Sequence, residues 1–257
     1  MRLFHEPADR RPRRALIAAA ALSALALLAG CAAPSGASAP APPTAQKERV
    51  PMSREPATPD PAAATDALFA AVAANDRAAV DRALAAGAEI DARGDQGRTP
   101  LVAATKAHRT EVAIALLDAG ADPNLQDDML DSAFLYAGAE GLDDILRATI
   151  AHGADTTATN RYGGTALIPA SEHGRVTTVQ ILIEAGVHLD HVNSLGWTAL
   201  HEAIVLGSGS PEQLLVVRQL LDAGASPTLP DGNGTPPREL AAARGYDDIV
   251  AELDAHL

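Results

Sequence analysis

The chain has 257 residues, a hydrophobic fraction of 47%, an aromatic fraction of only 3% and a formal net charge of −13. Affinity for nucleic acid and for anionic lipid surfaces comes from Lys and Arg residues that neutralise phosphates, so this charge argues against both as partners. Because alanine dominates the apolar residues, we expect a core made by closely approaching helices rather than by bulky side chains.

The first thirty residues have the organisation of an export signal. Five arginines and two acidic residues precede an apolar run from Ala15 to Ala29. This run is too short to cross a bilayer comfortably as a helix, which takes about 20 residues, but it matches the hydrophobic region of a secretory signal peptide. It ends in Leu28-Ala29-Gly30-Cys31, which resembles the lipobox of bacterial lipoproteins, where the cysteine becomes the acylated first residue of the mature chain.

Lipidation, a plain cleaved signal and a buried structural cysteine are alternative roles for Cys31, and the intact signal favours lipidation. Cys31 is the only cysteine, so it cannot form an internal disulfide. Ala32 follows it in place of Asp, and by resemblance to lipoprotein sorting this implies the outer membrane, with the protein on the periplasmic side of the envelope. Removal of residues 1–30, which carry a net charge of +3, leaves the mature chain at −16.

The segment that follows is predicted to be a disordered tether. Between Ala32 and Ala63 the sequence contains eight prolines and no apolar periodicity, so it cannot bury enough surface to fold. We therefore predict a lipoprotein signal peptide at 1–30, the lipidated cysteine and a Pro/Ala-rich tether at 31–63, and a folded domain at 64–257.

From Asp66 onward the chain repeats itself with a period of 33 residues. The dipeptide Gly-Ala or Gly-Val recurs with spacings of 33, 33, 33 and 38 residues, at Gly87, Gly120, Gly153, Gly186 and Gly224. Twelve residues after each of the first four glycines comes a helix N-cap candidate, and an alanine that allows close helix approach follows five residues later. These N-cap candidates are Thr99, Ser132, Thr165 and Thr198. One such unit cannot bury its own apolar stripe, so neighbouring units must stack.

The sequence GRTPLVAATKAHRTEVAIALLDAGADPNLQD, residues 97–127, resembles an ankyrin repeat, and the similarity runs from Asp66 to Leu257. The resemblance implies an all-α solenoid of about six helix-turn-helix units with short β-hairpin-like turns, which acts by binding proteins and has no shared catalytic activity. We place the units at 66–93, 94–126, 127–159, 160–192, 193–230 and 231–257, with atypical capping units at both ends.

Two units depart from the pattern. In the third, Leu130 replaces a glycine and Ser132-Ala133-Phe134 replaces Thr-Pro-Leu, which puts the geometry of its turn in question. The fifth has five extra residues around Gly207, which we place in the loop between its two helices. We also expect three glycines to end the first helices of their units in the left-handed conformation: Gly141, Gly174 and Gly207.

No catalytic, metal or cofactor site is predicted. His201 takes the place of the histidine in the ankyrin pattern Thr-Pro-Leu-His, which implies a structural hydrogen bond between neighbouring turns. A zinc-protease helix requires a second histidine where Val205 stands, and the other histidines lie at different phases of the repeat. The sequence also lacks a glycine-rich phosphate loop.

The predicted partner-binding surface combines the tips of the turns with the residues of the first helices that face the same side. Its members are Met129, Tyr136, Glu140, Arg161, Tyr162, His173, Trp197 and Glu202. Tyr, Trp and Arg are the residues most enriched in binding hot spots. The alternative that Tyr162 and Trp197 only pack against neighbouring turns stays open at this point.

These features together predict a non-catalytic protein-binding scaffold that is lipid-anchored in the bacterial envelope and binds one protein partner through a concave face. Such a scaffold supports another envelope protein or, as an immunity protein, neutralises a toxin. A purely structural envelope lipoprotein is a second alternative. An enzyme is a third, against which the phase of the repeat argues. The sequence does not identify the partner, and a monomer is favoured.

Overall fold

The structure is a computed structural model that describes residues 60–257. The chain divides into two units, Met1–Ala57 and Thr58–Leu257, and only the second is described below. The signal peptide, Cys31 and the tether as far as residue 59 lie outside the described residues.

Residues 60–257 form twelve α-helices in six consecutive pairs, with one short 3-10 helix and no strand. The first helices of the pairs are α1 (Pro61–Ala74), α3 (Pro100–Lys106), α5 (Ala133–Glu140), α7 (Leu167–Glu172), α9 (Ala199–Val205) and α11 (Pro237–Ala243). The second helices are α2 (Arg77–Ala85), α4 (Thr110–Asp118), α6 (Asp143–Ala151), α8 (Val176–Glu184), α10 (Pro211–Asp222) and α12 (Asp247–Ala255).

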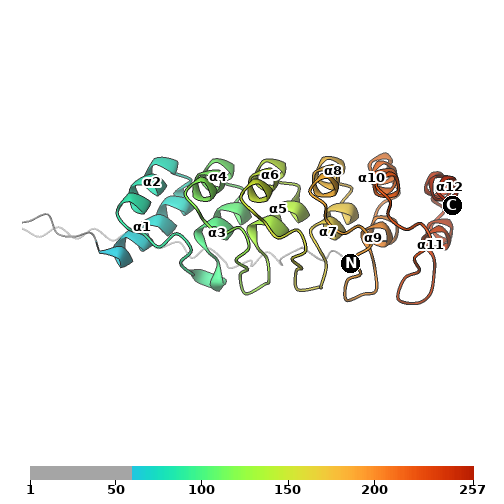
Figure 1. The fold of residues 1–257 in the computed structure, drawn as a ribbon, viewed down its shortest axis with the longest axis horizontal. Helices are drawn as coiled ribbons and strands as arrows, with labels where there is room; N and C mark the ends of the chain where they lie inside the picture. Colours follow the sequence, from blue (N-terminus) through green and yellow to red (C-terminus); the bar gives the residue numbers. More distant parts are fainter. Residues whose placement is uncertain (1–59) are drawn as a thin grey trace, which may run out of the picture. The chain divides into compact units, whose positions relative to one another are not determined.

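Figure 1 shows the six pairs side by side in chain order, with the first helices in one row, the second helices in another and loops that project from one side. The 3-10 helix η1 (Asp95–Gly97) lies in the first of these loops. The all-α solenoid of six helix pairs that the sequence predicts is confirmed.

Three of the six first helices start at a side-chain N-cap that the sequence predicts. The hydroxyl oxygens of Thr99, Ser132 and Thr198 accept hydrogen bonds from backbone N–H groups of the first turn, at 3.2, 3.2 and 3.4 Å. Thr165 does not cap its helix, which begins only at Leu167 and has no side-chain cap.

Helix α1 begins earlier than expected. Asp60 is its N-cap and accepts a hydrogen bond from the N–H of Ala62, while Pro61 fills the first helical position. A proline is favourable there because its missing N–H would have no partner in the helix. The predicted domain boundary at residue 64 therefore falls inside the first turn of α1.

The core follows the repeat and consists of small and medium-sized side chains. One alanine in each of four successive first helices is fully buried, namely Ala104, Ala137, Ala170 and Ala203. Leucines such as Leu101, Leu116, Leu182 and Leu220 are fully buried as well. The methyl groups of the alanines let neighbouring pairs approach closely, and a larger side chain at these positions would overpack the interface. The close helix approach that the sequence predicts is therefore present.

The turn between the two helices of a unit requires a positive φ. Gly141 and Gly174 provide it, with φ values of 73° and 64°, as predicted. The prediction is wrong for Gly207, because the five-residue insertion moves this conformation to Gly209, where φ is 68°. Gly207 is needed for space instead, since a Cβ there would collide with the carbonyl oxygen of Ala203.

Candidate functional site

Five hairpin loops, which we call fingers 1 to 5, project from the side of the first helices (Figure 1). They are residues 94–99, 127–132, 160–165, 193–198 and 231–236. Each is closed by a hydrogen bond from the backbone N–H of its first residue to the carbonyl oxygen of its fifth, at 2.9 to 3.0 Å. We call the surface made by the fingers and the exposed sides of the first helices the finger face.

The first residue of fingers 2 to 5 is always Asp or Asn, and its side chain shapes the hairpin. Its Oδ1 accepts hydrogen bonds from the N–H groups two and four residues further on, at 2.9 to 3.1 Å. These residues are Asp127, Asn160, Asn193 and Asp231. None of the four was predicted to shape a finger, although their spacings of 33, 33 and 38 residues repeat those of the glycines.

Neighbouring fingers are joined to each other by hydrogen bonds. The backbone N–H of Asp128 donates to Gln96, and that of Ser194 donates to Tyr162, at 3.0 and 2.9 Å. Between fingers 2 and 3 the link is a side chain, because Nε2 of Gln126 donates to the carbonyl oxygens of Leu130 and Thr159, at 3.0 and 2.8 Å. The fingers therefore form one continuous, hydrogen-bonded row.

Finger 2, whose geometry the sequence puts in question, keeps the hairpin of the other fingers. Leu130 stands where fingers 3, 4 and 5 have glycine, and it has a φ of 57°. This left-handed conformation is unfavourable for a leucine. Leu130 nevertheless remains 47% exposed and forms part of the surface.

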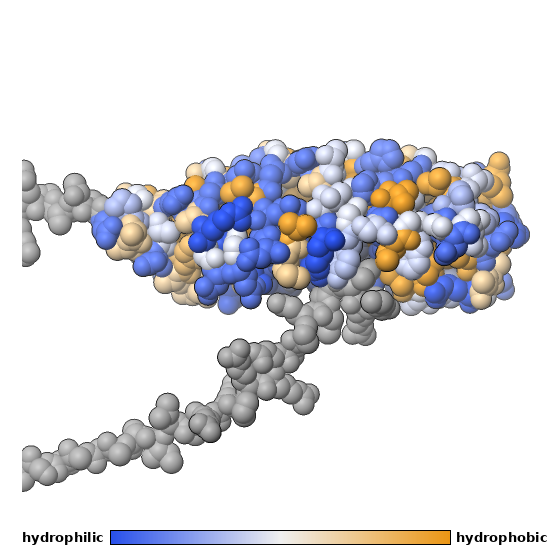
Figure 2. Space-filling view, turned by 90° about the horizontal axis from the view of Figure 1, so that it is seen from below, coloured by the Kyte–Doolittle hydropathy of each residue, from blue (hydrophilic) through white to orange (hydrophobic). Residues whose placement is uncertain are grey.

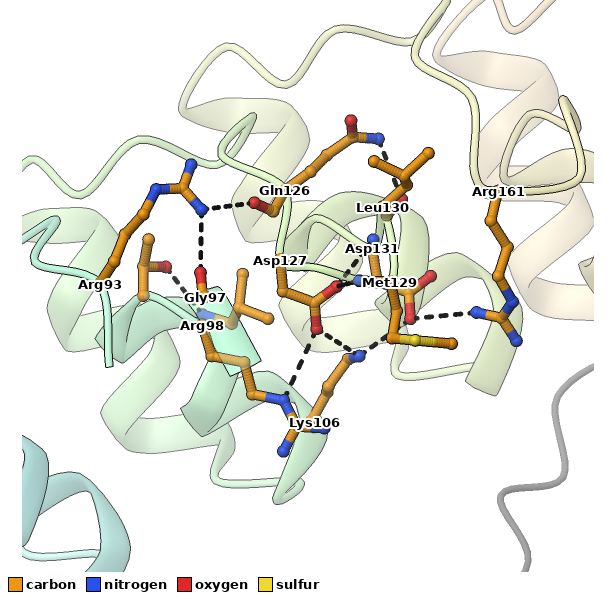
Figure 3. Close-up of polar contacts among 12 residues, drawn as sticks. Arg93, Gly97, Arg98, Lys106, Gln126, Asp127, Met129, Leu130, Asp131 and Arg161 are labelled. Carbon is orange, nitrogen blue, oxygen red and sulfur yellow. Dashed lines mark hydrogen bonds and ion pairs between the residues drawn. The ribbon is translucent and has the colours of Figure 1, made fainter. Parts of the chain in front are cut away.

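A network of charged side chains fills the base of finger 2 (Figure 3). Nζ of Lys106 donates to Oδ2 of Asp127 and to Oδ2 of Asp131, at 2.6 and 2.9 Å. Arg98 lies 3.6 Å from the same oxygen of Asp127, and Arg161 lies 3.7 Å from Asp131. Asp131 lies in the finger itself, yet its side chain is only 5% exposed.

Burial acts to raise the pKa of Asp127, but the opposing interactions are stronger. Lys106 and the backbone N–H groups of Asp131 and Met129 hold the pKa of Asp127 below its usual value. The carboxylate is therefore charged at neutral pH and locked in place. This part of the finger face is closed by its own ion pairs.

Aromatic rings lie beside this network and carry cations on their faces. Nζ of Lys106 is 5.3 Å from the centroid of the Tyr136 ring, and the guanidinium of Arg161 is 4.7 Å from the centroid of the Tyr162 ring. Both tyrosines are partly exposed. The rings are therefore fixed in orientation and still accessible from outside.

The structure puts most of the predicted partner-binding residues on the finger face. Met129 is 43% exposed and His173 is exposed. The partly exposed members are Tyr136, Glu140, Arg161, Tyr162 and Trp197. Figure 2, which is seen from the side of the fingers, shows that apolar groups on this face are separated by polar surface. The binding role of these residues stays a prediction.

Glu202 is the exception, and its prediction as a surface contact is wrong. Its side chain is only 1% exposed, and its Oε1 accepts a hydrogen bond from Nδ2 of Asn193 at 2.7 Å. Burial, together with the charge of Glu172, raises the pKa of Glu202 to about 8. Glu202 therefore holds the residue that shapes finger 4 and does not face a partner.

His201 has a structural role, as the sequence predicts, but within its own unit. Its Nδ1 lies 2.8 Å from the hydroxyl oxygen of Thr198 and accepts the backbone N–H of Thr198 at 3.1 Å, which completes a capping box. Burial lowers the pKa of His201, although Asp231 and the backbone of Leu229 oppose this effect. The ring is therefore neutral at physiological pH.

Residues 60–257 lack two further features. Within that range no group of three or more His, Cys, Asp or Glu residues is placed to hold a metal ion. No helix in the same range is long and apolar enough to cross a membrane.

Stacked helix pairs with a row of hydrogen-bonded fingers are the architecture of a helical repeat protein, a class that presents an extended binding surface. The family model described as ankyrin repeats (3 copies) matches residues 53–127 and 134–231. The chain therefore belongs to the ankyrin-repeat family.

Relatives and solved structures agree with this assignment. The chain is 37% identical to the putative ankyrin repeat protein YahD of Escherichia coli (strain K12) over 177 residues, which cover 68% of this chain and 88% of YahD. An ankyrin repeat domain from Acinetobacter baumannii AYE matches with a TM-score of 0.72 and 49% identity, over 74% of this chain and 96% of that domain. The ankyrin repeat protein EF0377 matches with a TM-score of 0.71 and 37% identity, over 74% and 97%.

Proposed function

We propose that this protein is a non-catalytic scaffold that binds a protein partner through its finger face while a lipid on Cys31 anchors it in the bacterial envelope. Ankyrin-repeat proteins generally mediate protein–protein interaction. One observation carries the location of the binding surface: Tyr136 of α5 is partly exposed beside Arg161, Tyr162 and Trp197, which are partly exposed on a row of fingers that hydrogen bonds hold rigid. A preordered surface loses little entropy on binding, and aromatic and Arg side chains provide most hot spots.

A crosslinking pull-down from envelope extract tests the binding surface. The bait is the chain with Cys31→Ser, compared with the same bait carrying Tyr162→Ala and Trp197→Ala. The matched control is Leu215→Ala, which changes an apolar residue that is 44% exposed on the second-helix side, in α10. Capture of one protein by the bait and the control, and its loss with the folded double variant, supports the proposal.

Two results of the same experiment contradict it. Equal capture by all three baits moves the interface away from the fingers. No saturable capture by any bait favours a purely structural envelope lipoprotein. Thermal melting of each bait shows that the variants remain folded.

The lipid anchor is proposed from the sequence around Cys31, which ends an export signal and is the only cysteine. Each buried CH₂ group of an acyl chain contributes about 0.8 kcal/mol to membrane binding. Cys31→Ser is therefore expected to abolish incorporation of labelled fatty acid and to move the protein into the soluble fraction. Labelling that persists in the variant contradicts the proposal. Ala32→Asp, which keeps the cysteine, is expected to keep the label and move the protein from the outer to the inner membrane.

A further inference from the structure

The base of finger 2 and the base of finger 4 are two copies of one pocket, because their residues correspond after two repeat periods of 33 residues. We call the first copy the Lys106 pocket, with Lys106, Asp127, Asp131 and Tyr136. The second copy, the Glu172 pocket, has Glu172, Asn193, Trp197 and Glu202 at the same positions in the same order. Lys106 and Glu172 are the last residues of α3 and α7. Tyr136 and Glu202 lie on the following first helices, α5 and α9.

The Lys106 pocket contains its own cation. The ammonium group of Lys106 contacts both carboxylates at 2.6 and 2.9 Å and lies 5.3 Å from the centroid of the Tyr136 ring. The side chain of Lys106 is only 11% exposed, so the ammonium group fills the pocket. Carboxylates and an aromatic ring around one ammonium group are a favourable arrangement for a cation.

The Glu172 pocket has no such cation among its own four residues. Glu172 stands where Lys106 stands in the other copy, and Glu202 stands where Tyr136 stands. Glu172 is 9% exposed, and its Oε2 is buried without a hydrogen-bond partner in the described part of the chain. Such a buried acceptor is costly unless a partner satisfies it.

Within residues 60–257, neither Glu172 nor Glu202 has a Lys or Arg side chain among its charged neighbours. His173, next to Glu172 in α7, opposes the rise that burial causes in the pKa of Glu172, but its own side chain is exposed. Nε2 of Gln213 donates to the backbone carbonyl oxygens of Ser171 and Glu172, at 3.1 and 3.0 Å, and so holds the end of α7 in place. The pocket is rigid and acidic.

We propose that the Glu172 pocket binds a cationic side chain, the ammonium of Lys or the guanidinium of Arg, which the partner protein supplies. That cation would stand beside two carboxyl groups, as Lys106 does within the chain two units earlier. Trp197 of finger 4 stands at the position of Asp131 and is partly exposed, and cations bind most favourably to Trp faces. The inference rests on the proposed binding function and adds the chemistry of the partner.

A titration with a small cation tests the pocket without the partner. The side-chain carboxyl carbons of Glu172 and Glu202 are followed by NMR against pH, in the full chain with Cys31→Ser, in n-butylammonium chloride and in sodium chloride at equal concentration. Butylammonium represents a lysine side chain, and n-butanol is its neutral counterpart. If butylammonium favours the ionised form of the pocket tenfold more than sodium does, the pH at which the pair titrates falls by about one unit.

The expected result is a lower midpoint in butylammonium than in sodium, no change with butanol, and loss of the difference in Glu172→Gln. Glu140→Gln is the matched control, because it removes a partly exposed carboxylate of α5 on the same face, and it should keep the difference. Equal midpoints in the two salts overturn the inference, since the two carboxyl groups then only share a proton.

The outcomes separate the inference from the proposed function. A lower midpoint in butylammonium supports the pocket even where the pull-down captures nothing, and then only the proposed function fails. Equal midpoints, together with a captured partner whose binding is unchanged by Glu172→Gln, overturn the pocket and leave the function in place. A melting temperature equal to that of the wild type shows that Glu172→Gln remains folded.

Discussion

The Lys106 pocket and the Glu172 pocket have corresponding backbone positions but treat charge in opposite ways. The first pairs two buried carboxylates with the ammonium group of Lys106. The second places two carboxyl groups together, and Asn193 is the polar partner of Glu202. The repeat therefore fixes where side chains stand, while their identity decides whether the base of a finger holds a paired cation or two adjacent carboxyl groups.

The largest expected effect on stability comes from removing the cation of the Lys106 pocket. Lys106→Met leaves Asp127 and Asp131 buried with only the more distant arginines, and we expect the free energy of unfolding to fall by about 3–5 kcal/mol. Urea unfolding at neutral pH measures this loss. Lys106→Arg, which keeps the charge, is the control and should lose much less. A loss below about 1 kcal/mol for Lys106→Met would show that the network adds little to stability.

The Glu172 pocket should make the stability of the protein depend on pH. The pKa of Glu202 is about 8 in the folded chain, above its ordinary value of 4.5, so the folded state binds more protons between these values. This stabilisation is fully present below pH 4.5 and is lost as pH rises through about 8, by up to about 1.4 kcal/mol per pH unit. The pH dependence that Asp127 contributes has the opposite sign. Its pKa is lowered in the folded chain, so its stabilisation is present above the usual pKa range of an aspartate and is lost in acid.

Glu202→Gln is the variant that isolates this effect. It should be more stable than the wild type at pH 8 and show a flatter dependence between pH 5 and 8, as measured by urea unfolding at several pH values. Asp128→Asn, at an exposed position of finger 2, is the control and should leave the slope unchanged. A wild-type stability that rises through this range would contradict the assignment.

A smaller effect concerns finger 2 itself. Leu130→Gly removes the left-handed strain of a leucine with a φ of 57°, and we expect a gain of about 1 kcal/mol in the free energy of unfolding. Gly163→Leu makes the reverse change in finger 3, where a Cβ would crowd the hydroxyl of Ser194, and it should destabilise. Thermal melting compares the two. A loss of stability in Leu130→Gly would show that its side chain packs against the face.

The smallest expected change in stability is that of Trp197→Phe, within about 0.5 kcal/mol, because the residue is partly exposed. This variant keeps an aromatic face with a weaker attraction for cations, so it should reduce the effect of butylammonium on the Glu172 pocket without abolishing it. The NMR titration measures the change. A large loss of stability with an unchanged titration would show that Trp197 only packs.

The sequence predicts well what depends on short-range order. The N-caps Thr99, Ser132 and Thr198 and the buried Ala104 stand at fixed distances within a unit, so counting residues is enough to find them. The Asp and Asn residues of the fingers follow the same period and could have been found in the same way. Thr165 fails as a cap although its position is correct, since its helix begins only after Ala166.

What the sequence alone determined is the six-unit solenoid, since a helix period, a capping residue and a terminating glycine are local signals that repetition reinforces. Only the tertiary structure decided how deeply each polar side chain is covered. Asp131 lies in a finger and Glu202 was predicted to contact a partner, yet both are buried. Asp131 lies beside Lys106 and Arg161 and Glu202 beside Glu172, which all belong to neighbouring units. The burial of a side chain depends on the neighbouring units, so it cannot be predicted by counting residues within one unit.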